Sequence, residues 1–232
     1  MNNIQILGVS HKIASNESFS HLMDEYCDSI FKEKYFPMLS EDTLIIFETK
    51  EDFPYVLTCD NSRYEHYLKE ISELLFSSDH APDILPCDVR MKNRKVAEQY
   101  MEKLQQATDY LISVYDYIPK CNKSTASLID ELIAGKDLGI SPTLCFFSKQ
   151  TAKWMLQKES EQQKKLLSLA TQYSKKYEHI FVIVGGLHAI KMKRENSLLN
   201  VEILFDKENE FFRTALHASV ARDEIITKSS QI

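Results

Sequence analysis

Cys59 and His66 are a thiol and an imidazole only a few residues apart in the sequence. A cysteine becomes a strong nucleophile when an imidazole within hydrogen-bond reach takes its proton, so this pair could carry covalent catalysis. His11, near the start of the chain, could hold a substrate group or contribute to a haem site. A histidine at the end of a strand more often packs there and makes hydrogen bonds, and that interpretation is favoured.

A second group of candidates surrounds Gly185 and Gly186, which follow the apolar run at residues 180–184. A strand that ends in glycines at the start of a helix can place backbone N–H groups against the phosphates of a dinucleotide. The full pattern is Gly-x-Gly-x-x-Gly, and Leu187 and Ile190 stand at the other two glycine positions. Their side chains would keep the backbone away from a pyrophosphate, so NADP is not an expected cofactor.

Composition and charge exclude several classes of protein. The 232 residues are 44% hydrophobic and 27% charged, which is typical of a globular chain of one large or two small domains. The net charge of -6 argues against a nucleic-acid binder, so transfer RNA is not an expected partner. Five scattered cysteines and the spacing of His179 and His188 predict neither disulfides nor a metal site. Without a signal sequence or a membrane-spanning run, the chain is expected to be cytoplasmic.

Apolar spacing predicts the elements that must position these residues. Strands are expected at residues 4–10, 43–47 and 53–57, the last two as a hairpin. Helices are expected at residues 19–30 and 64–76, which completes a βαββα unit over residues 1–80. The proline-containing stretch 77–86 is interpreted as a break between elements.

The remaining sequence changes to helix and then to a short βαβ pattern. Helices are expected at residues 96–115, at 124–134 with Gly135 as its end, and from 141 beyond Trp154. They form a predicted bundle over residues 90–165. A strand at 180–184, a helix, a strand at 201–205, a last helix at 211–220 and a polar tail follow. The predicted fold class is α+β, with one domain over residues 1–165 and a truncated Rossmann-like βαβ segment over residues 166–232.

In this order the pieces resemble the N-terminal part of glutamyl-tRNA reductase, the enzyme that reduces transfer-RNA-bound glutamate for tetrapyrrole synthesis. The most specific likeness is residues 8–14, Gly-Val-Ser-His-Lys-Ile-Ala, which is similar to the motif that ends the first strand of that family. The resemblance runs from residue 3 to about residue 160. It implies a ligand cleft that contains His11, Lys12, Glu51 and Tyr100.

The departures from the family lie at its chemistry. In the register without gaps, Thr49 stands where the family has its cysteine nucleophile, and Glu51 stands where an arginine would bind the glutamyl carboxylate. A hydroxyl needs a strong adjacent base to act as a nucleophile, and an anion would repel the substrate. A competing alignment with two insertions restores the nucleophile at Cys59 and the cation at Arg63. The register without gaps is preferred because insertions would misplace the thiolate.

These residues lead to three hypotheses. The first is a catalytically inactive relative of glutamyl-tRNA reductase that acts in haem or sirohaem biosynthesis by binding a tetrapyrrole-pathway enzyme or a small-molecule ligand. The second is a divergent but active reductase that uses Cys59. The third is a haem-binding or haem-sensing protein, with haem as its cofactor.

Overall fold

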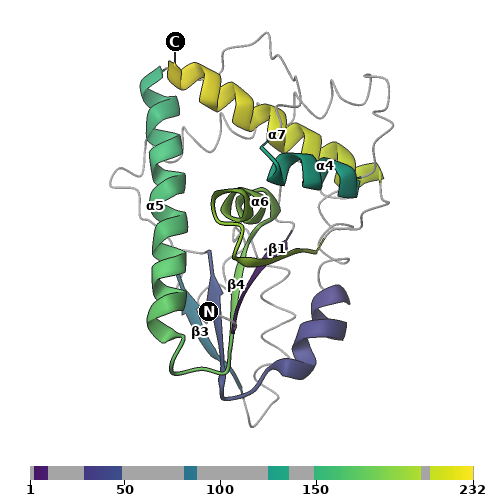
Figure 1. Cartoon of the computed structure of the whole chain (residues 1–232), viewed down its shortest axis with the longest axis vertical. Helices are drawn as coiled ribbons and strands as arrows, with labels where there is room; N and C mark the ends of the chain where they lie inside the picture. Colours follow the sequence, from purple (N-terminus) through teal and green to yellow (C-terminus); the bar gives the residue numbers. More distant parts are fainter. Residues whose placement is uncertain are drawn as a thin grey trace, which may run out of the picture.

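The computed structural model describes residues 3–9, 29–48, 81–87, 125–135, 149–204 and 210–231. Within these ranges the strands form one sheet of five parallel strands in the order β3-β2-β4-β1-β5 (Figure 1). In chain order the strands are β1 (Ile4–Val9), β2 (Thr43–Phe47), β3 (Asp83–Pro86), β4 (His179–Gly185) and β5 (Asn200–Ile203). The expectation of a chain that combines helices with strands is confirmed.

The middle strands β2 and β4 are apolar on both faces, as strands of a parallel sheet that is covered on two sides must be. β4 lies between β1 and β2, and Val182 pairs with Ile6 on one side and with Ile46 on the other. All three side chains have no exposed surface. The apolar run predicted as a strand of a small C-terminal segment is therefore the middle of the whole sheet.

Two helices cover one face of the sheet, α5 (Lys149–Tyr173) and α6 (Gly186–Glu195). They pack against it through buried side chains that include Leu166 of α5 and Ala189 of α6. On the other face lie a turn of π-helix, η1 (Phe31–Tyr35), and a short 3-10 helix, η2 (Phe36–Met38). The Tyr35 ring packs edge-on against Phe181 at 5.3 Å between ring centroids.

A further layer lies outside α6. In Figure 1, α7 (Glu210–Gln231) crosses one end of α5 and runs over α4 (Thr125–Ile133). Apolar side chains of these two helices and of α6, among them Leu132, Ile190 and Val220, form a second core. α4 ends as predicted, since Gly135 has a φ of 73°, the left-handed conformation that glycine adopts at helix ends. No helix in the described ranges is long and apolar enough to cross a membrane.

Several predicted boundaries change. The predicted hairpin of residues 43–47 with residues 53–57 is wrong, because β2 is hydrogen-bonded on both sides to the parallel strands β3 and β4. Residues 53–57 lie outside the described ranges. The predicted break at residues 77–86 contains β3, an edge strand, where prolines at the ends interrupt no ladder. The last helix does not stop at residue 220 but continues to Gln231.

The predicted division at residue 165 falls inside α5, and strands from either side of it belong to one sheet. The C-terminal segment contains β4, α6 and β5 in that order, but β1 from the N-terminal end lies between the two strands in the sheet. Residues 90–124, the first part of the predicted helical bundle, lie outside the described ranges.

Candidate functional site

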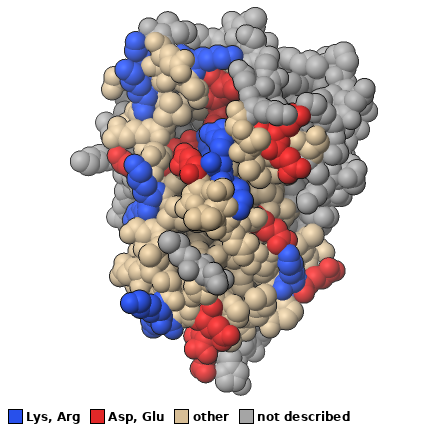
Figure 2. All heavy atoms as spheres, viewed as in Figure 1, with Lys and Arg blue, Asp and Glu red and all other residues tan. Residues whose placement is uncertain are grey.

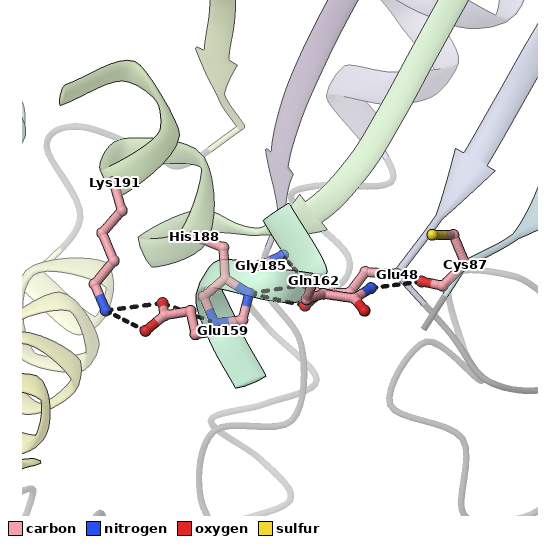
Figure 3. Close-up of polar contacts among 7 residues, drawn as sticks. All are labelled: Glu48, Cys87, Glu159, Gln162, Gly185, His188 and Lys191. Atoms are coloured by element: carbon pink, nitrogen blue, oxygen red, sulfur yellow. Dashed lines mark hydrogen bonds and ion pairs between the residues drawn. The ribbon is translucent and has the colours of Figure 1, made fainter. Parts of the chain in front are cut away.

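The carboxyl ends of β2 and β4 lie side by side, and each is followed at once by a polar side chain or a helix start. Glu48 is the residue after β2. Gly185 ends β4, and α6 begins at the next residue and carries His188 in its first turn. Because the strands are parallel neighbours, these ends meet at the edge where open parallel sheets bind their ligands. Figure 3 shows Glu48 and His188 pointing toward each other there.

The Glu48 carboxylate closes the N-terminus of α6. Both of its oxygens lie 3.0 Å from Nδ1 of His188, and the backbone N–H of Gly185 donates to Oε2 at 3.4 Å. The unpaired N–H groups at a helix start carry a partial positive charge, so an anion is stabilised in this position. The Glu48 side chain is only 7% exposed. An internal carboxylate thus lies at the start of this helix, a position where anions are stabilised.

The other side of His188 faces a second carboxylate. Its Nε2 lies 3.5 Å from Oε1 of Glu159, which comes from the middle of α5. Lys191, one turn further along α6, donates to both Glu159 oxygens at 2.8 and 2.9 Å and also contacts Asp223 of α7. We call these five residues, Glu48, His188, Glu159, Lys191 and Asp223, the ionic chain.

Charges in the ionic chain set the protonation of its members. Burial alone would lower the pKa of His188, but the charge of Glu48, its hydrogen bond and the charge of Glu159 outweigh burial and raise the pKa above its ordinary value. Burial likewise opposes the charge on Lys191, and Asp223 and Glu159 raise its pKa. Along the ionic chain, His188 and Lys191, whose charged forms these neighbours favour, therefore alternate with three carboxylates.

The end of β3 joins the same edge. Gln162, on the turn of α5 after Glu159, donates from Nε2 to the backbone carbonyl of Cys87 at 2.6 Å. Both residues are buried, at 3% and 2% exposure. The Cys87 thiol packs in the apolar core below α5, which places it away from the surface, so its position does not suit a nucleophile.

The arrangement suits an ion network better than acid–base catalysis. A glutamate that holds one ring nitrogen of a histidine is a common way to orient a general base, whose other nitrogen must then face a substrate. Here the other nitrogen faces Glu159. With both ring nitrogens turned toward carboxylates, His188 is held as a cation that binds α6 to β2 and α5.

Most of the predicted site residues lie outside the described ranges: His11, Lys12, Thr49, Glu51, Cys59, Arg63, His66 and Tyr100. Gly185 and Gly186 are described and form the predicted turn from strand to helix. His179 lies at the opposite end of β4 from His188 and stacks on Phe181, so the structure does not bring these two histidines together.

Sequence reasoning missed Glu48, Glu159, Lys191 and Asp223. The sequence did contain a signal for Glu48. This residue directly follows an apolar strand, and Gly185 stands at the end of a second apolar strand, so the two could have been expected at the same edge of a parallel sheet. The hairpin assumption hid it, since a hairpin turns β2 away from β4. No local pattern marks Glu159 or Asp223, which lie inside long helices with many other charged residues.

Among the described residues, no three histidine, cysteine, aspartate or glutamate side chains are arranged to hold a metal ion. No protein-family model matches the chain, and the searches of curated proteins and of solved structures gave no match either.

Proposed function

We propose that this chain is a catalytically inactive, cytoplasmic relative of glutamyl-tRNA reductase that acts in tetrapyrrole biosynthesis by binding a pathway enzyme or a small-molecule ligand. One observation carries the proposal. At the N-terminus of α6, where a dinucleotide-dependent reductase would hold the cofactor pyrophosphate, the Glu48 carboxylate accepts the Gly185 N–H and contacts His188.

Charge opposes a cofactor at this turn. A pyrophosphate would have to displace Glu48 from the helix N-terminus and would be repelled by it if it stayed nearby. Separating Glu48 from His188 would also leave two charges without their partner at a largely buried position.

The sequence around Glu48 supports the same conclusion. Thr49, the next residue, stands where the family resemblance places the cysteine nucleophile. Glu48 is turned toward His188 and the start of α6, and both ring nitrogens of that histidine are already engaged. Glu48, the residue before Thr49, and His188 are thus committed to each other.

The test has a catalytic arm and a binding arm. Purified chain is titrated with NADPH while cofactor fluorescence is followed, and glutamyl-tRNA reduction is assayed beside an active reductase as positive control. We expect no saturable NADPH binding and no semialdehyde. Saturable binding together with turnover would overturn the proposal.

The binding arm uses tagged chain expressed in its native cells, with mass spectrometry of co-purifying proteins and small molecules. We expect enrichment of a tetrapyrrole-pathway enzyme or intermediate over a purification with an unrelated tagged protein of similar size. Absence of both would contradict the proposed role, even if the chain proves inactive.

A further inference from the structure

The exposed face of α5 carries an excess of positive charge. Residues 149–176, which are α5 and the three residues after it, contain seven lysines and two glutamates, a net charge of +5 in a chain whose total is -6. The remaining residues therefore carry -11. In Figure 2, viewed as in Figure 1, basic side chains recur along the side of the molecule that α5 occupies. Such a separation of charge within one chain favours a partner of negative charge at this face.

The two glutamates of this segment do not pair with its lysines. Glu159 points inward into the ionic chain, where Lys191 and His188 contact it. Glu161 is exposed, and its Oε1 accepts a hydrogen bond from Nε2 of Gln157 at 2.8 Å. Along α5, which the structure describes over its whole length, neither carboxylate forms an ion pair with a lysine of the same helix. The positive charge of this face is therefore not cancelled within the helix.

Three of the lysines form a row on one side of the helix. Lys149, Lys153 and Lys164 are exposed and, in the described ranges, form no hydrogen bond or ion pair. Because an α-helix has 3.6 residues per turn, positions four and eleven residues apart fall on the same side, and Lys153 and Lys164 lie roughly 16 Å apart along the axis. Gln157 and Ser160, exposed and neutral, lie between them. We call these three lysines the lysine row.

The other exposed side chains of α5 favour a protein as the partner. Every exposed position of this helix is polar. A helix that lies on a membrane buries an apolar face in the lipid, and a single-stranded nucleic acid stacks its bases on aromatic rings. A nucleic-acid duplex carries one charge per ~1.7 Å of its axis, far closer than lysines roughly 16 Å apart. Carboxylates separated by neutral polar residues, as on a protein surface, match the lysine row better.

We propose that the exposed face of α5 binds an acidic segment of a partner protein. The carboxylates of that segment lie against the lysine row, and the neutral side chains between the lysines form hydrogen bonds with it. The proposal deepens the partner-binding role given above and rests on it only for the place of the partner in a pathway. Because complementary charges act mainly on the rate of encounter, the complex should form quickly and weaken as salt is added.

The probe is a fluorescein-labelled peptide of about twenty glutamates, which is longer than the lysine row even as a helix. It is titrated into the full chain at low ionic strength while its anisotropy is followed, and we expect saturable binding. Lys153→Glu together with Lys164→Glu should weaken binding about tenfold or more, because two attractive contacts become repulsive. Arg194→Glu, at an exposed position of α6, is the matched control for Lys164→Glu alone. It makes the same change in net charge and should leave the affinity within about twofold.

Absence of saturable binding, or equal losses of affinity in the Lys164→Glu and Arg194→Glu proteins, would overturn the proposal. Tighter binding of a uridine oligonucleotide of the same length, or of vesicles that contain phosphatidylserine, would also overturn it and would assign the lysine row to a nucleic acid or a lipid surface. Circular dichroism checks the fold of each variant, and the two single variants decide the question if the double variant is lost. The assay contains no pathway component, so it can fail while the tests of NADPH binding and of co-purification succeed, and the reverse.

Discussion

Replacing Lys191 with methionine tests the ionic chain at the point where it is most buried. The lysine side chain is 9% exposed, and its ammonium group is shared by Glu159 and Asp223, which are 18% and 20% exposed. Methionine keeps most of the aliphatic stem but removes the charge. Asp223 then loses the cation it contacts, and Glu159 keeps only His188, 3.5 Å away. Breaking a buried ion pair from one side costs about 3–5 kcal/mol.

Because each carboxylate keeps about a fifth of its surface in water, we expect a loss of stability near the lower end of that range, about 3 kcal/mol. Urea unfolding followed by circular dichroism measures it. Adding Glu159→Gln and Asp223→Asn to the Lys191→Met protein removes the uncompensated charges and should recover most of the loss. A cost below about 1 kcal/mol, the value of a surface ion pair, would show that Lys191 makes no buried ion pair with these carboxylates. A triple variant less stable than the single one would show the same.

Three further predictions concern the charge on His188, the close approach of β1 to α6, and the packing of α5 on the sheet. The pKa of His188 is raised above its ordinary value of 6.5. The stabilisation by the charged ring should therefore be complete below about pH 6.5 and be lost as the pH rises through the raised pKa. Urea unfolding at several pH values measures this pH dependence of stability, and the His188→Gln protein should lack it. Gly8→Ala should cost about 1–3 kcal/mol in thermal or urea unfolding, because the new Cβ would lie 2.8 Å from Cβ of Ala189 on α6. Leu166→Ala in the core should lower the free energy of unfolding by about 2–5 kcal/mol. Leu198→Ala, at a position 93% exposed, should change it by less than about 0.5 kcal/mol. Similar losses for both variants would contradict the packing of α5 on the sheet.

The elements that the sequence predicts best are those with a strong local signal. The apolar runs at β1, β2, β4 and β5 and the glycine at the end of α4 are all found where periodicity and turn chemistry place them. These features depend on neighbours in the chain, which is why a single sequence carries them. β3 was missed because its prolines signal a break, although at a sheet edge they interrupt no hydrogen-bond ladder.

The order of the strands could not be read in the same way. β1 pairs with β4 across most of the chain, through the register Ile6 to Val182, and β2 pairs with the other side of β4. Nothing local to these runs specifies their partners, because each is apolar on both faces and would suit any central position. The candidate site depends on this order, since only the meeting of β2 with β4 brings Glu48 to His188.

We infer that Glu48 lies at the start of α6 and holds His188 in its charged form. The most direct measurement is a titration of the His188 ring by nuclear magnetic resonance in the unaltered chain and in the Glu48→Gln protein, with the His188→Gln protein to assign the signal. We expect a pKa above the ordinary value of 6.5 in the unaltered chain and a clearly lower one when the carboxylate is replaced by an amide. The same pKa in both proteins would contradict it.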